Sequence, residues 1–262
     1  MTTTTDDVLT TATFVGGPTI AFTYAGRTFL TDPTFDQPGD YDNGVTLRKL
    51  VGPALQPEAL GPIDVVLLSH DQHADNLDHA GRDVLARVPV VLSTPDAAAR
   101  ITGVRGLEPW EQVDLGDVVV TAVPARHGPE GAEALTGHVT GFVLEATGEP
   151  TVYVSGDNAS IDVVAAIARR FGGIELALLF VGGADVGRFP DEPLTLDAAR
   201  ASAVADLLVE AVVVPVHHSD WAHFVDPVSA VVDRFARAGR ADRLVVVPRG
   251  VPTEVRGRRR LT

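Results

Sequence analysis

The segment LLSHDQHADNLDHAG, residues 67–81, joins the end of an apolar run to three histidines and three aspartates. The preceding run, residues 63–69, is typical of a buried strand. Histidine and aspartate side chains are ligands of divalent metal ions, and residues at a strand end reach the edge of a sheet, where ligands bind. The segment therefore predicts a metal site at the point where this strand ends.

The composition limits which ligands such a site can use. The chain has 262 residues, is 45% hydrophobic, which supports a sizeable core, and contains no cysteine. Disulfides, thiolate-bound zinc and cysteine nucleophiles are thereby excluded, so a metal must be held by His, Asp, Glu or Asn. The N-terminus lacks the pattern of a signal peptide, and no apolar run approaches the roughly 20 residues that span a bilayer. We therefore expect a cytoplasmic protein without a membrane partner.

The net charge of −14 argues against nucleic acid as a ligand, because nucleic-acid binding depends on neutralising phosphates. Short charged runs at a terminus are usually solvated, and we expect this of the arginine-rich C-terminal segment. The expected partner is a small-molecule substrate, and self-association into a homo-oligomer is left open. The arginines of this segment are Arg249, Arg256, Arg258, Arg259 and Arg260.

The order of the predicted elements indicates one α/β domain over residues 1–262. Residues 13–33 form an antiparallel meander with Gly-containing turns, and the Pro/Gly-rich residues 35–62 form a long surface loop. Strands and helices alternate after this loop. The predicted strands are 63–69, 88–93, 117–124, 140–146, 151–156, 174–180, 211–216 and 243–248, and the predicted helices are 81–88, 95–102, 160–172, 195–211 and 226–239.

Several of these strands are continuous apolar runs, which suits sheets that are covered on both faces. Ser160 and Thr195 are predicted to cap the N-termini of two helices, and Gly172 and Gly239 to end two. Two mixed sheets with outer helices, a four-layer αββα sandwich, accommodate this order of elements.

Polar residues follow four of the predicted strands directly. A single such residue is more often a turn or cap residue than a ligand. Strand ends at one sheet edge converge on a shared crevice, however. Because four strands of a chain without cysteine are each followed by such a residue, the pattern favours a metal site. The residues are His70, Asp71, His73 and Asp75 after the first strand, then His127, Asp157, and the pair His217 and His218.

The order of these motifs resembles the metallo-β-lactamase superfamily. A histidine-rich motif is followed by PARHG (124–128), SGD (155–157) and PVH (215–217), and the opening hairpin with its TDP turn (31–33) is also similar. The resemblance covers roughly residues 11–224, and LLSHDQHADNLD is most similar to the ascorbate-6-phosphate lactonase-like branch. It implies an αββα fold and metal-dependent hydrolysis of a small, anionic or lactone- or ester-type substrate, with one or two ions of zinc or manganese.

The resemblance also implies a set of ligands. His70, His73 and His127 would hold one metal. Asp75 and His217 would belong to a second position, with Asp157 bridging the two.

The first motif departs from the pattern H-x-H-x-D-H in two places. One extra residue separates His70 from His73, so that Asp71 or Gln72 could stand where a ligand is expected. Asn76 replaces the third histidine. An amide oxygen coordinates hard cations but is a poor zinc ligand, so the second site is expected to be weak, empty or selective for an ion such as manganese. Single-metal chemistry therefore stays open.

The implied mechanism uses a metal-bound hydroxide. A divalent ion can lower the pKa of bound water from 15.7 to about 7 and polarise a carbonyl or phosphoryl group. Asp75 or Asp157 would orient that hydroxide or carry its proton to the leaving group. Asp32 would hydrogen-bond a ligand histidine, unless it only forms an Asp-Pro turn.

Further candidates lie in the segment HHSDWAHF (217–224) and among the arginines. His218 and His223 are candidate replacement ligands, His223 is also a candidate substrate donor, and Trp221 is either a pocket wall or ordinary packing. Exposed basic residues are usually solvated, but four could recognise an anionic substrate. These are Arg48, Lys49, Arg126 and Arg188, whereas His79 and His138 are expected to be surface or structural residues.

Two other functions fit the same motifs. A phosphodiesterase or nuclease of this fold is disfavoured by the acidic surface. A catalytically impaired binding protein with a degenerate metal site is the other alternative, and metal content would separate it from an enzyme.

Overall fold

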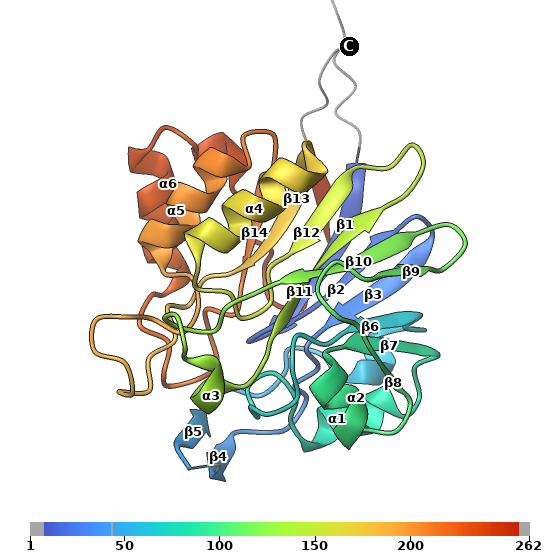
Figure 1. The fold of residues 1–262 in the computed structure, drawn as a ribbon, viewed down its shortest axis with the longest axis vertical. Coiled ribbons are helices and arrows are strands. Elements are labelled where there is room, and N and C mark those ends of the chain that lie inside the picture. The colour runs from blue at the N-terminus through green and yellow to red at the C-terminus, as the bar shows by residue number, and fades with distance from the viewer. Residues whose placement is uncertain (1–7, 43, 257–262) are drawn as a thin grey trace, which may run out of the picture.

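The computed structural model describes residues 8–42 and 44–256, which form two β-sheets packed face to face with helices on their outer sides (Figure 1). The predicted α/β class and four-layer αββα sandwich are confirmed. Within the described residues, no helix is long and apolar enough to cross a membrane.

The first sheet has the strand order β15-β1-β2-β3-β6-β7-β8. Strands β1, β2 and β3 pair antiparallel as the predicted meander, and β6, β7 and β8 extend the sheet in parallel from β3. The strands are β1 (Val8–Gly16), β2 (Thr19–Tyr24), β3 (Arg27–Thr31), β6 (Val65–Leu67), β7 (Val90–Ser93), β8 (Val104–Gly106) and β15 (Thr253–Arg256). Helices α1 (His79–Leu85) and α2 (Pro95–Arg100) accompany this sheet.

The second sheet has the strand order β14-β13-β12-β11-β10-β9, with β12, β13 and β14 parallel. Its strands are β9 (Gln112–Asp114), β10 (Val119–Pro124), β11 (Thr140–Glu145), β12 (Thr151–Val154), β13 (Ile174–Phe180) and β14 (Val212–Val216). Helices α4 (Ile161–Phe171), α5 (Ala198–Leu207) and α6 (Val228–Arg237) cover its outer face, and the short α3 (Glu133–Thr136) follows β10.

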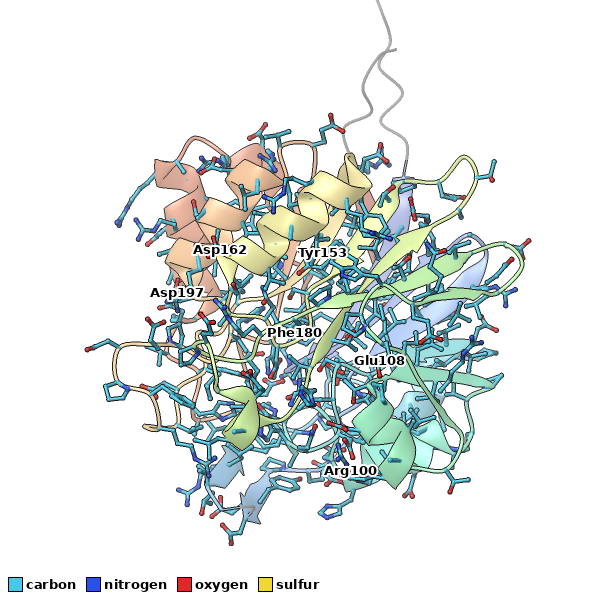
Figure 2. The ribbon with its side chains drawn as sticks, in the orientation of Figure 1. Arg100, Glu108, Tyr153, Asp162, Phe180 and Asp197 are labelled. Atoms are coloured by element: carbon cyan, nitrogen blue, oxygen red, sulfur yellow. The ribbon has the colours of Figure 1, made fainter. Side chains whose placement is uncertain are left out.

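Alternation of side chains along the strands explains the layers. Phe22 and Phe29 of the first sheet and Phe142 and Phe180 of the second face the core between the sheets. Tyr153 of the second sheet instead faces outward, beside α4, and belongs to the apolar cluster that includes residues of α4, α5 and α6 (Figure 2). The second sheet therefore buries both faces, which is why several of its strands have continuous apolar sequences.

The predicted helix ends are correct for α4 and wrong for the start of α5. Ser160 accepts a hydrogen bond from Val163 N, and Gly172 follows the last turn of α4. The N-cap of α5 is Asp197, which accepts from Arg200 N at 2.7 Å. Thr195 uses its hydroxyl elsewhere, accepting from Ala184 N at 3.0 Å, so a contact remote in sequence displaces it from the cap.

The prediction of a strand at residues 243–248 is wrong. This segment begins in a 3-10 turn (Ala241–Arg243) and makes one isolated bridge to the second sheet, Val213 to Leu244. The next bridge, Phe14 to Arg249, is with the first sheet. Because the segment passes from one sheet to the other, its apolar residues pack without pairing along a single strand.

The predicted loop 35–62 contains a β-hairpin, β4 (Gly39–Asp42) and β5 (Thr46–Lys49), and a 3-10 turn (Pro57–Leu60). Arg48 pairs with Asp40 across the hairpin at 2.7 Å, and Tyr41 donates to Asp36 at 3.0 Å. Lys49 makes a backbone bridge to Trp221, which joins the hairpin to the segment after β14. The hairpin is therefore fixed beside the strand ends that carry the predicted site.

Candidate metal centre

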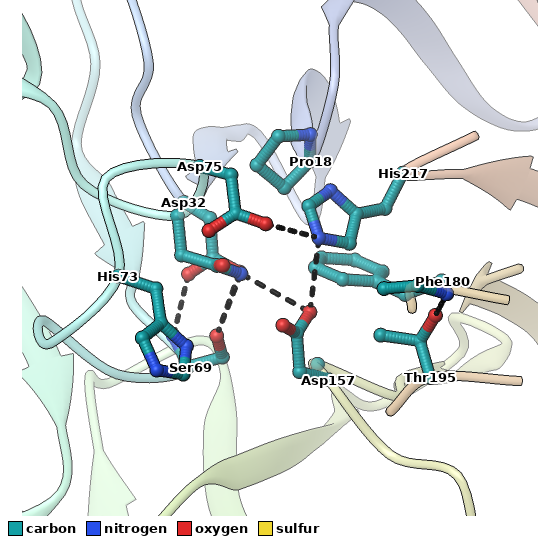
Figure 3. A network of polar contacts seen from close by, with 12 residues as sticks. Pro18, Asp32, Ser69, His73, Asp75, Asp157, Phe180, Thr195 and His217 are labelled. Atoms are coloured by element: carbon teal, nitrogen blue, oxygen red, sulfur yellow. Dashed lines mark hydrogen bonds and ion pairs between the residues drawn. The ribbon is translucent and has the colours of Figure 1, made fainter. Parts of the chain in front are cut away.

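The four strand-end motifs meet at one place, and Figure 3 shows three of them there, through Asp75, Asp157 and His217. The ends of β6, β10, β12 and β14 supply the side chains. Within the described residues, the ligand atoms of His70, His73 and His127 lie within 4.8 Å of one another, as do those of Asp75, Asp157 and His217. We call these sets the tri-histidine group and the carboxylate group.

Glycine at position 156 allows the two sheets to approach here. The backbone of Gly156 has a φ of +55°, and a Cβ added to it would lie 2.5 Å from Thr140 O and 2.9 Å from Ser69 Cβ. A larger residue would therefore strain the turn and push β12 away from the end of β6.

Two rings of the tri-histidine group, His70 and His73, are held neutral by their surroundings. Burial and the neighbouring His73 lower the pKa of His70, while burial and His127 lower the pKa of His73 to about 4. His70 Nε2 lies 2.8 Å from His73 Nδ1. His127 Nδ1 faces Leu194 O at 2.7 Å, which leaves its Nε2 toward the centre. Neutral rings with free lone pairs are the form that binds metal.

The carboxylate group is buried and ionic. His217 Nε2 lies 3.3 Å from Asp157 Oδ1 and 3.5 Å from Asp75 Oδ2. Burial alone would lower the pKa of His217, but the two carboxylates raise it to about 10. Burial likewise opposes ionisation of the acids, yet His223 and His217 lower the pKa of Asp75, and His217 and His127 lower that of Asp157.

The unpaired atoms of the carboxylate group fit a bound cation. Among the described residues, Asp75 Oδ1, Asp157 Oδ2 and both ring nitrogens of His217 are buried without a hydrogen-bond partner. Such atoms are costly in a folded protein, because they have lost water without replacing it. A divalent ion coordinated by nitrogen and oxygen would satisfy carboxylate and imidazole atoms together.

A hydrogen-bond network supports the two groups from behind. Asp32 Oδ2 accepts from Ser69 Oγ at 2.8 Å and from Asn76 Nδ2 at 3.2 Å, and Ser69 Oγ lies 2.9 Å from His70 Nδ1. Burial and Asp157 raise the pKa of Asp32 to about 7. The prediction that Asp32 hydrogen-bonds a ligand histidine directly is therefore wrong. Asp32 contacts Ser69, and Ser69 contacts His70.

Three of the predicted alternative ligands, Asp71, His218 and Gln72, do not belong to either ligand group. The carboxylate of Asp71 turns toward α2, where Arg100 Nε donates to it at 2.9 Å, which removes Asp71 from the ligand set. His218 packs its ring against Phe14, with centroids 5.2 Å apart. Gln72 lies beside the centre and lines the adjoining cavity.

A cavity of about 60 Å³, partly open to solvent, adjoins the centre. His73, Asp75, His127 and His223 line it on the side of the two groups. The remaining walls are mostly apolar and come mainly from the hairpin and from the segment after β13, with Ala74 and Thr136 from the loop after β6 and from α3. These lining residues are Tyr41, Val45, Leu47, Ala74, Thr136, Ala184, Val186, Arg188 and Leu194.

Of the predicted substrate contacts, Arg188 and His223 line this cavity. Arg48 pairs with Asp40, Arg126 donates to Ser160 Oγ at 2.8 Å, and Trp221 is buried beneath the hairpin against the ring of Tyr41. Sequence reasoning missed the hairpin residues Tyr41, Val45 and Leu47. Their one signal was a set of alternating apolar residues inside a polar, Gly-containing segment.

Comparison with known proteins identifies relatives along most of the chain. A family model described as Beta-lactamase superfamily domain matches residues 27–218. A UPF0173 metal-dependent hydrolase of Pyrococcus abyssi is 25% identical over 206 residues, covering 76% of this chain and 85% of that protein.

Two solved structures share the fold. The isothiocyanate hydrolase from Delia radicum gut bacteria has a TM-score of 0.82 at 21% identity, over 94% of this chain and 99% of the other. A possible metal-dependent hydrolase from Veillonella parvula has a TM-score of 0.79 at 19% identity, over 95% and 100% of the two chains.

Proposed function

The chain belongs to the beta-lactamase superfamily, and from this membership we propose that it is a metal-dependent hydrolase of a small molecule bound in the cavity beside the two ligand groups. The observation that carries the proposal is the convergence of four strand ends on two sets of ligand atoms, each within 4.8 Å. The Pyrococcus abyssi relative, named a metal-dependent hydrolase, supports it.

The residues of the chain divide the work at the centre. His70, His73 and His127 would hold one ion and Asp75, Asp157 and His217 a second. A divalent ion supplies Lewis acidity and activates water at neutral pH. Asp157 faces both groups, because its oxygens lie 3.6 Å from His127 Nε2 and 3.3 Å from His217 Nε2. The ionised carboxylate of Asp75 or Asp157 would also accept a proton from the attacking water.

The cavity favours a substrate with an apolar part and at most one negative charge. Val45, Leu47 and Val186 form apolar wall, and Arg188, which is exposed, is the basic residue of the lining. Lactones and esters of small acids have these properties. One structural neighbour is named an isothiocyanate hydrolase, and isothiocyanates are also small electrophiles, so they belong in the same assay panel. A nuclease would need more cations here to neutralise phosphates.

Metal content tests the proposal most directly. We expect protein purified without added metal to hold at least one equivalent of zinc, manganese or iron per chain, measured by plasma mass spectrometry. Dialysis against a chelator should remove both the metal and the hydrolysis of lactone, ester or isothiocyanate substrates, and added metal should restore both. Less than about a tenth of an equivalent after metal supplementation would instead support the impaired binding protein.

Arg188→Gln tests the charge preference of the cavity. We expect the variant to raise KM by up to about fivefold for anionic esters, since an exposed ion pair contributes about 0.2 to 1 kcal/mol. KM for neutral esters should not change. Arg48→Gln is the matched control, because this exposed arginine lies on the hairpin outside the cavity lining. Equal behaviour of the two variants would show that Arg188 does not contact the substrate.

A further inference from the structure

The residue in the third-histidine position of the first motif does not face the centre as a nitrogen ligand. Asn76 is fully buried, and its Nδ2 donates to Asp157 Oδ1 at 3.1 Å, to Asp32 Oδ2 at 3.2 Å and to Ser69 Oγ at 3.4 Å. An amide nitrogen with hydrogen bonds to carboxylates has no lone pair to give a cation. Asn76 therefore links the acids, and the carboxylate group lacks the imidazole that this position would supply.

A second imidazole reaches the carboxylate group from another direction. His223 Nε2 lies 2.9 Å from Asp75 Oδ2, the same oxygen that lies 3.5 Å from His217 Nε2. Its side chain is 8% exposed and lines the cavity. Two imidazole nitrogens thus flank one carboxylate oxygen, an arrangement that suits three ligands of one ion.

The segment after β14 is built to hold this ring in place. His217 has a φ of +57°, a backbone conformation that turns the chain sharply at the end of the strand. Asp185 N donates to His223 O at 2.9 Å, and Ala184 bridges to Phe224. The ring of His223 packs 4.6 Å from that of Phe224, and among the described residues its Nδ1 is buried without a hydrogen-bond partner. Nε2 is therefore the atom that the ring presents to the centre.

We propose that His223 completes the second metal site, taking the part that residue 76 does not play, so that Asp75, Asp157, His217 and His223 bind one ion. This inference rests on the proposed function. Two carboxylates and two imidazoles form a harder ligand set than the tri-histidine group, which favours manganese or iron at this position. The competing explanation is that His223 only positions Asp75 through a hydrogen bond.

His223→Gln separates the two explanations, because glutamine can still donate a hydrogen bond to Asp75 but is a poor metal ligand. Titration with Mn²⁺ in a calorimeter should give two equivalents for the wild type and one for the variant. The affinity for the second Mn²⁺ ion should fall further than it does when a residue that only supports a ligand is lost. Such a loss costs roughly 10- to 100-fold in metal affinity. His138→Gln is the matched control, since His138 is exposed and pairs with Asp96 at 2.9 Å.

A second measurement does not depend on how the His223 variant folds. In a His73→Ala protein, whose tri-histidine group is disabled, pulsed EPR counts the imidazole nitrogens on Mn²⁺ bound by the carboxylate group. Two nitrogens support the proposal, and one overturns it. If the wild type and the His223→Gln variant both bind two equivalents of metal, the proposal for His223 is also overturned. The proposed function would then remain intact. A wild-type protein that binds no metal would refute the proposed function itself.

Discussion

Asp157→Ala protein is expected to lose more than about 100-fold in kcat/KM, together with metal at both positions, because loss of a residue that only supports a ligand already costs roughly 10- to 100-fold. Asp157 lies within ion-pair distance of His127 in one ligand group and of His217 in the other. His127→Ala should show a similar loss of activity. Steady-state kinetics and metal analysis on the same preparations measure both effects.

His138→Ala is the control for this prediction, because His138 lies exposed at the surface. It should keep wild-type activity and metal content, and circular dichroism should show the native fold in all three variants. Retention of two ions and of activity in Asp157→Ala protein would contradict the bridging position of this carboxylate.

Asn76→His is expected to destabilise the protein without adding a metal ion. The ring must fit a site that is fully buried, which costs about 1 to 3 kcal/mol when a core is overpacked. It also removes the amide that donates to Asp32 and Asp157, and an unsatisfied buried group costs about 1 to 3 kcal/mol more. The free energy of unfolding should therefore fall by about 2 to 6 kcal/mol in urea titrations.

Zinc titration of the same variant provides the second measurement for position 76. We expect the wild-type number of equivalents, since the imidazole of the carboxylate group comes from elsewhere in the chain. A stable variant with an additional zinc equivalent would show instead that position 76 faces the metal and that asparagine weakens the site.

The strand ends could be predicted from the sequence because two local signals coincide there. Residues 151–156 and 211–216 are apolar runs, and Asp157 and His217 follow them at once, so the strand and its exit are both visible. Near His70 the local signal is ambiguous, since Asp71 is equally close to the strand end. The choice depends on Arg100, 29 residues away, which pairs with Asp71 and leaves the histidine to face the centre.

The cavity walls could not be predicted for a related reason. Residues 39–49 have the composition of a loop, and their hairpin is fixed by contacts with Trp221, far along the chain. For residues 243–248 a strand is predicted where none forms. An apolar run predicts a strand whether or not an open sheet edge lies beside it. Pattern identifies buried segments, whereas pairing depends on neighbours that are distant in sequence.

Most of the cavity wall away from the two ligand groups comes from segments outside both large sheets, the hairpin 39–49 and the segment 184–194. One contact ties the latter to a metal-facing residue, the hydrogen bond between His127 Nδ1 and Leu194 O. Because that acceptor is a main-chain carbonyl, replacing the side chain of Leu194 leaves it in place. Mutations in these two segments can therefore accumulate and be selected for a new substrate while the chemistry is inherited unchanged, which makes this architecture readily evolvable.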